Sequence, residues 1–227
     1  MANRSSILSV RARGEWAVFT RPELKSERVS YNCITPSAAR GILEAILWKP
    51  AIAWRVERIK VLSPIRFTSI RRNEVNNRIT VPNRKVIQEG GALWRYFSDE
   101  DRAQRNTIAL RWVDYIIEAR IELTGKAGPE DNLKKFEEMF KRRVENGQQW
   151  HAPYLGCREC AAEVMPVDGA PKPQDITRDL GIMLWDIDYG SKKRTPRFFN
   201  ASLKHGVLEV PENPEATLDA LAKGGAA

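Results

Sequence analysis

Alternating apolar and charged side chains between Thr107 and Leu123 restrict the fold of this chain more than any other feature. From Val113 onward the apolar residues recur at every second position, with charged residues between them: Val113, Tyr115, Ile117, Ala119, Ile121 and Leu123 against Asp114, Glu118, Arg120 and Glu122. Successive side chains of a strand point to opposite faces, so the pattern predicts a strand with one buried and one solvated face. The protein must therefore contain a β-sheet.

Two helices accompany this strand in the sequence. The first follows Thr35, which is suited to cap it, and has Pro36 at its first position. The second is predicted from Glu130 to Asn146, with acidic residues in its first turn, basic residues near its end and Gly147 after it. Each helix has one apolar stripe, made by Ala39, Ile42, Leu43 and Ile46 in the first and by Leu133, Phe136, Phe140 and Val144 in the second.

Further strands are predicted at 7–12, 54–62 and 161–167. The apolar positions of the second change phase, so we expect a bulge near Arg58. The resulting order is strand, helix, strand, strand, helix, strand, which is the ferredoxin-like or RRM-like order.

We therefore predict an α+β fold with two domains. A ferredoxin-like (RRM-like) domain spans 1–168 and carries a long basic insertion at 71–105, where no regular period is found. A small antiparallel β domain follows at 169–210, with a hairpin through Lys204, His205 and Gly206. The Pro-, Glu- and Ala-rich segment at 211–227 is expected to be a flexible tail.

The composition excludes several classes of protein. Of 227 residues, 42% are hydrophobic and 29% charged, which is the balance of a globular chain and not of a disordered one. The apolar stretches are too short to cross a bilayer, and the first residues lack the apolar core of a signal peptide. Three cysteines do not make a disulfide framework. We expect a soluble, cytoplasmic protein that contacts no membrane.

The common catalytic motifs of nucleotide-binding proteins and hydrolases are missing from the sequence. Cys157 and Cys160 form a CxxC that, with His151 and Cys33, would supply four zinc ligands. A single CxxC without a second matched pair is weak support for zinc, and small core residues explain these cysteines better. We therefore expect neither a metal nor a cofactor.

Basic residues indicate the kind of partner. The 37 Lys and Arg against 29 Asp and Glu give a net charge of +8. Several of the basic residues form clusters in one loop, at the start of the insertion and on the second helix. The aromatic Trp94 and Tyr96 lie within the insertion. Cations neutralise phosphates and aromatic rings stack on unpaired bases, so the pattern favours nucleic-acid binding over merely solvated charge. The clusters are Arg21, Lys25 and Arg28; Arg71 and Arg72; and Lys134, Lys135, Lys141, Arg142 and Arg143.

Four segments resemble one known family in the same order. They are FTRPELKSERVSYNCITPSAARGILEAILWKP (Phe19 to Pro50), RRNEV (Arg71 to Val75), VDYIIEA (Val113 to Ala119) and PYLGCREC (Pro153 to Cys160). The chain resembles the fifth CRISPR-associated subunit of subtype I-C, the form labelled c or d, over nearly its whole length to about Tyr189. This family belongs to the RAMP group, whose members pair an RRM-like domain with a small β-sheet domain.

The resemblance implies work on RNA. Members of the family bind the repeat-derived 5′ handle of the guide RNA beside the backbone and large subunits of the Cascade surveillance complex, where target DNA is a further possible partner. In this subtype the same subunit cuts precursor CRISPR RNA in the repeat without metal. A Tyr, a Lys and a His serve as its catalytic groups, and the matching positions here are Leu47, Lys135 and Phe136.

Because leucine and phenylalanine exchange no proton, two interpretations stay open. In the first, which we favour, the chain is an endoribonuclease in which Lys135 stabilises the phosphate while His151 or Tyr154 replaces the base. In the second, it binds the handle without cleaving. A third interpretation is nonspecific binding of DNA. The expected RNA contacts are Arg21, Lys25, Arg28, Arg71, Arg72, Lys135, Arg142, Arg143 and Tyr154.

Overall fold

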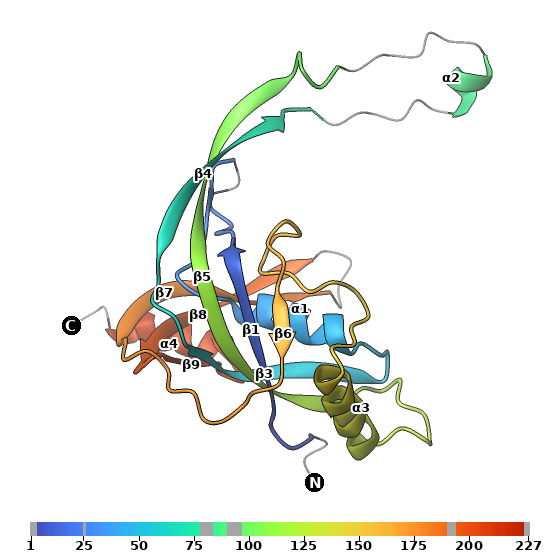
Figure 1. Cartoon of the computed structure of the whole chain (residues 1–227), viewed down its shortest axis with the longest axis vertical. Helices are drawn as coiled ribbons and strands as arrows, with labels where there is room; N and C mark the ends of the chain where they lie inside the picture. Colours follow the sequence, from blue (N-terminus) through green and yellow to red (C-terminus); the bar gives the residue numbers. More distant parts are fainter. Residues whose placement is uncertain (1–3, 25, 78–83, 90–96, 190–193, 225–227) are drawn as a thin grey trace.

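The computed structural model describes residues 4–24, 26–77, 84–89, 97–189 and 194–224. It is a mixed α/β structure built on one curled sheet with the strand order β6-β1-β5-β3-β9-β8-β7, in which neighbours are antiparallel (Figure 1). These strands are β1 (Leu8–Ala17), β3 (Ile52–Val61), β5 (Arg102–Leu123), β6 (Glu163–Met165), β7 (Arg178–Asp188), β8 (Thr195–Lys204) and β9 (Val207–Glu209). Two further strands, β2 (Arg28–Val29) and β4 (Phe67–Val75), pair with the beginning of β5.

Strand β5 is the centre of the sheet and confirms the alternation of the sequence. Val113, Tyr115, Ile117, Ala119 and Ile121 are all buried, whereas the charged residues between them remain partly exposed. The strand begins at Arg102, earlier than the sequence pattern indicated. The bulge expected near Arg58 is also confirmed, because the register of β3 against β5 shifts between Val56 and Arg58.

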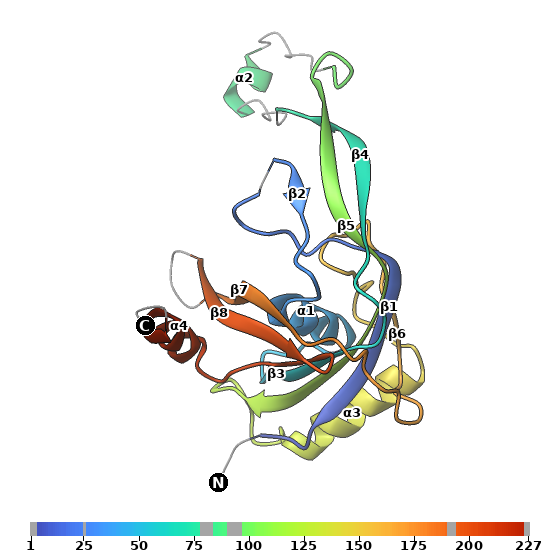
Figure 2. The same cartoon turned by 90° about the vertical axis from the view of Figure 1, so that its left-hand side faces the viewer.

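The two predicted helices form as α1 (Pro36–Ile46) and α3 (Leu133–Glu145). The Thr35 hydroxyl accepts a hydrogen bond from the Ala38 N–H, which makes Thr35 the N-cap of α1. The prediction of acidic residues in the first turn of α3 is wrong, because Asn132 caps the helix and Glu130 and Asp131 lie before its first turn. Helix α1 lies inside the curl of the sheet, in contact with β3 and β7, and α3 lies beside it against β5 (Figure 2).

The C-terminal strands continue the same sheet. The hairpin through Lys204–Gly206 is confirmed by the pairing of β8 with β9, and β9 also pairs with β3. Beyond these strands, the prediction of a flexible tail is wrong for residues 214–224, which form the helix α4 (Pro214–Gly224). The Thr217 hydroxyl accepts from the Asn200 N–H at 3.0 Å, so α4 is fixed to β8.

The predicted insertion contains an arm of two paired strands. Strand β4 pairs with β5 from Phe67 opposite Leu110 to Val75 opposite Arg102, and this ribbon extends away from the rest of the sheet (Figure 1). A short helix, α2 (Arg84–Gln88), lies near its end. Trp94 and Tyr96, which we expected to stack on bases, lie outside the described residues. No helix in the described part of the chain is long and apolar enough to span a membrane.

Candidate nucleic-acid interface

Three arginines converge on one carboxylate where the arm leaves the body, a place we call the arm base. Arg72 of β4 lies directly opposite Arg105 of β5, and Arg28 of β2 approaches from the neighbouring strand. Glu74 Oε1 lies 3.3 Å from Arg72 Nη2 and 3.6 Å from Arg28 Nη2, and its Oε2 lies 3.7 Å from Arg105 Nε. Alternation along β4 and β5 places Arg72, Glu74 and Arg105 on the same side of the ribbon.

A tight loop supplies the second carboxylate of the arm base. The Cys160 N–H donates to the Cys157 carbonyl at 2.9 Å, and the turn between them carries Glu159 to 3.3 Å from Arg72 Nη1. Its own backbone N–H, followed by Arg72 and Arg28, holds the pKa of the Glu159 carboxyl below its usual value. Gly156 makes the close approach of this loop possible, since it has a φ of +87° and a Cβ there would lie 2.1 Å from the Val18 carbonyl oxygen.

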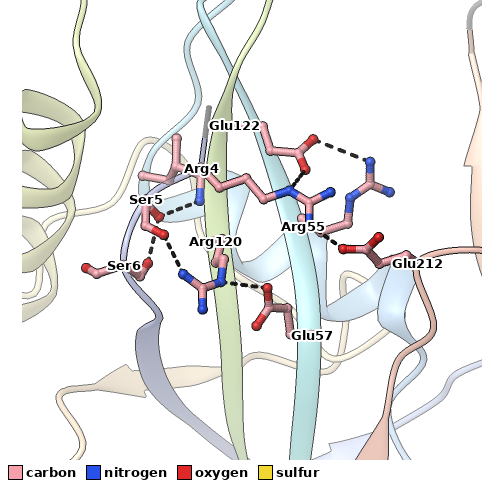
Figure 3. Close-up of polar contacts among 9 residues, drawn as sticks. Arg4, Ser5, Ser6, Arg55, Glu57, Arg120, Glu122 and Glu212 are labelled. Carbon is pink, nitrogen blue, oxygen red and sulfur yellow. Dashed lines mark hydrogen bonds and ion pairs between the residues drawn. The ribbon is translucent and has the colours of Figure 1, made fainter. Parts of the chain in front are cut away.

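The charged face of β3 and β5, which we call the charged sheet face, has a different arrangement. Arg120 donates to Glu57 and to the Ser5 carbonyl, both at 2.7 Å, and Arg4 pairs with Glu122 at 2.7 Å and with Glu212 (Figure 3). Six cations there meet six carboxylates: Arg4, Arg11, Arg55, Arg58, Lys60 and Arg120 with Glu57, Asp114, Glu118, Glu122, Glu209 and Glu212. Charge on this face is balanced within the protein.

The outer face of α3 presents cations to solvent. Lys134, Lys141 and Arg142 are exposed and have no ion-pair partner among the described residues. Lys135 Nζ lies 3.1 Å from Asp131 Oδ1, and 44% of the lysine side chain is exposed, so it faces outward. Arg143 instead donates to the Ile46 carbonyl at 2.6 Å and fixes α3 to the end of α1.

The residues that match the family's Tyr and His positions are both in the core. Leu47 is completely buried and Phe136 is 2% exposed, so neither side chain reaches the protein surface. Lys135, next to Phe136, points outward. His151 is exposed on the loop after α3, and its Nδ1 lies 3.1 Å from the Ala152 carbonyl oxygen. Lys135 and His151 do not contact each other in the described structure.

The remaining predicted contact residues lie in several places. Arg21 stacks over Tyr31 at 4.7 Å and lies near Glu23, while Arg71 is exposed on the arm. Tyr154 lines a cavity of about 430 Å³ together with Phe19, Arg40 and other residues beside α1. Lys25 lies outside the described residues.

Sequence reasoning missed Arg105 and Glu159 as members of the site. Arg105 was within the predicted insertion, but only its pairing with β4 places it opposite Arg72. Glu159 stands inside the CxxC motif, which we weighed only as a source of metal ligands. The sequence does contain a signal for Glu159. Gly156, Cys157 and Cys160 build the tight turn that carries it.

The four residues weighed as zinc ligands are not brought together. Cys33 is fully buried, and burial raises the pKa of its thiol to about 12. Burial likewise raises the pKa of Cys160 to about 11, while His151 is exposed. Within the described ranges no three His, Cys, Asp or Glu side chains are grouped to hold a metal ion.

Solved structures share this fold. A crystal structure of a CRISPR-associated protein superposes with a TM-score of 0.70 at 21% identity, covering 96% of this chain and 97% of the other. A chain of a CRISPR RNA-guided surveillance complex superposes with a TM-score of 0.51 at 14% identity, covering 96% of this chain and all of the other. The chain thus shares its overall fold with these two structures.

Sequence comparison gives the family. The Cas_Cas5d family, described as CRISPR-associated protein (Cas_Cas5), matches residues 7–211. The CRISPR pre-crRNA endoribonuclease Cas5d of Mannheimia succiniciproducens is 46% identical over 220 residues, which cover 93% of this chain and 96% of the relative. The protein of the same name from Thermus thermophilus is 40% identical and is covered to 97%, with 96% of this chain matched. The chain therefore belongs to the Cas5d family.

Proposed function

We propose that this protein binds the repeat-derived 5′ handle of a subtype I-C guide RNA and cleaves precursor CRISPR RNA within the repeat. The observation that carries this proposal is the 46% identity, over almost the whole chain, to a protein named as a pre-crRNA endoribonuclease. The arm base and the outer face of α3 supply the cations that RNA phosphates need. The expected partners are CRISPR RNA and the Cascade backbone and large subunits, with target DNA inside the complex, in the cytoplasm.

The proposed cleavage needs no metal or cofactor. A base removes the proton of a 2′-hydroxyl, the resulting alkoxide attacks the adjacent phosphorus, and the P–O5′ bond breaks as an acid donates a proton to the leaving 5′-oxygen. Lys135, exposed at the start of α3, stabilises the charge on the phosphate. His151, which is exposed on the loop after α3, or Tyr154 serves as the base.

We interpret the strands β6-β1-β5-β3 and the helices α1 and α3 as a ferredoxin-like (RRM-like) domain over 1–168. The strand order and the position of both helices on one face support this interpretation. The segment 169–210 is then a small second domain whose strand β9 is joined to β3.

A test of the proposed activity is incubation of the purified protein with labelled repeat RNA in excess chelator. A discrete product that ends in a 2′,3′-cyclic phosphate is expected. A stable complex with intact repeat RNA supports handle binding without cleavage. Equal retention of duplex DNA and repeat RNA supports nonspecific binding and contradicts the proposal.

Handle binding without cleavage is the second candidate, and one observation favours it. Leu47 and Phe136, which match the family's Tyr and His, are buried and packed in the core. They have structural roles and no proton to exchange. If the protein only binds, Lys135→Ala changes RNA affinity but there is no cleavage to lose.

A further inference from the structure

We propose that Arg28, Arg72 and Arg105 form a binding site for one phosphate of the RNA backbone, and that Glu159 occupies this site until RNA displaces it. The inference rests on the proposed RNA binding and identifies which cations carry it and what competes for them. It also gives the CxxC segment a role that requires no metal.

The three arginines have more hydrogen-bond donors than their partners use. Each guanidinium offers five N–H groups, whereas the two carboxylates of the arm base, Glu74 and Glu159, approach only at 3.3–3.7 Å. Two neutral oxygens accept further bonds, Asn76 Oδ1 from Arg105 at 3.0 Å and Thr107 Oγ1 from Arg72 at 3.4 Å, and they leave the charge of the arginines unchanged. Arg72 Nε is buried and has no hydrogen-bond partner in the described part of the chain. Three cations against two carboxylates leave a net positive charge, which favours binding of another anion.

Phosphate is the anion that suits this geometry. Guanidinium groups are planar forks that bind phosphate oxygens in pairs, with hydrogen bonds of about 2.7–2.9 Å. The site lies where β2, β4 and β5 meet, at the root of the arm (Figure 2). Arg71 and Arg102 are exposed on the same ribbon, so an RNA strand along the arm passes further cations.

Glu159 is the carboxylate that RNA can displace. Its side chain is 64% exposed and contacts Arg72 alone among the three arginines, whereas Glu74 is 28% exposed and is shared by all of them. The turn between Cys157 and Cys160 holds the backbone of Glu159 in place, so the carboxylate leaves by rotation of its side chain. Loss of this exposed pair costs little, since surface ion pairs contribute only modestly.

Substitution of Glu159 tests the competition directly. Glu159→Gln is expected to raise the affinity for single-stranded repeat RNA roughly threefold, because Arg72 no longer has a competing carboxylate. The slope of log affinity against log salt should stay close to that of the wild type, because RNA places the same phosphate on the three arginines in both proteins.

Glu163→Gln is the matched control. Glu163 is 60% exposed and pairs with Arg13, so this variant makes the same change of charge away from the arm base. An equal gain in affinity for both variants would show a general charge effect and overturn the proposal. Unchanged affinity of Glu159→Gln would overturn it as well.

Arg72→Gln, combined with Glu159→Gln, gives a double-mutant cycle that tests whether the two residues act through one contact. Arg72→Gln alone should lower the affinity roughly tenfold, and adding Glu159→Gln to it should then have no effect, since both act through one contact. An independent threefold gain in the double variant would contradict the proposed competition. Absence of RNA binding by the wild type would remove the proposed function and this site together, whereas RNA binding that ignores Glu159 would remove this site alone.

Discussion

The charged sheet face and the arm base both contain arginines and carboxylates, yet they use them differently. On the charged sheet face, Arg120 donates two bonds of 2.7 Å, and six cations meet six carboxylates. At the arm base, three arginines share two carboxylates at 3.3 Å or more. Six cations matched by six carboxylates hold strands and chain ends together, whereas three arginines that share two carboxylates keep a net positive charge that is available to a ligand. Counting basic residues in a sequence does not separate these two groups.

The arm base depends on the loop that carries Glu159, and Gly156→Ala should disturb this region most. The new methyl group would lie 2.1 Å from the Val18 carbonyl oxygen on a backbone with a φ of +87°. We expect the free energy of unfolding to fall by about 3 kcal/mol, measured by urea denaturation.

Gly41→Ala is the control for this change. Gly41 lies in α1, and a Cβ there meets no atom within 4 Å. Alanine favours a helix over glycine, so this variant should be stabilised by about 1 kcal/mol. Equal stability of the two variants would show that the loop tolerates a side chain at Gly156.

Helix α3 also has exposed cations, and substitution of Lys135 tests whether one of them has a role in cleavage beyond RNA binding. If the chain cleaves RNA through this lysine, Lys135→Ala should lower the single-turnover cleavage rate about a hundredfold, because the charge on the phosphate loses its stabilisation. The affinity for RNA should fall only about threefold. Lys141→Ala removes an exposed cation from the same helix and should retain the cleavage rate; a similar loss in both variants would mean that Lys135 has no special role.

Arg120→Gln should have the smallest effect, and one opposite in kind to that of Arg72→Gln. Loss of the bonds to Glu57 and to the Ser5 carbonyl should lower the free energy of unfolding by about 1 kcal/mol, as measured by urea denaturation. The affinity for RNA should remain that of the wild type. Weaker RNA binding by Arg120→Gln, with stability unchanged, would reverse the roles assigned to the two regions.

Local signals account for the parts of the fold that were predicted correctly. Thr35 and Pro36, two neighbouring residues, predict where α1 begins. The change of phase among the apolar positions of β3 predicts the bulge near Arg58. The C-terminal helix α4 was missed because Ala, Glu and Pro also suit a flexible tail, and its hydrogen bond to Asn200 is a contact between distant segments. The family itself was identified correctly from four sequence segments.

The sequence by itself determined the alternating faces of β5, the helix starts and the excess of basic residues, since periodicity, capping and charge are properties of neighbouring positions. Only the tertiary structure decided which cations have partners. Arg72 meets Arg105 and Glu159 because β4 pairs with β5 and a loop from far along the chain closes over them. Burial of Leu47, which lies outside the apolar stripe predicted for α1, was decided in the same way. Pairing and burial of this kind join residues that are distant in sequence, and no local pattern specifies them.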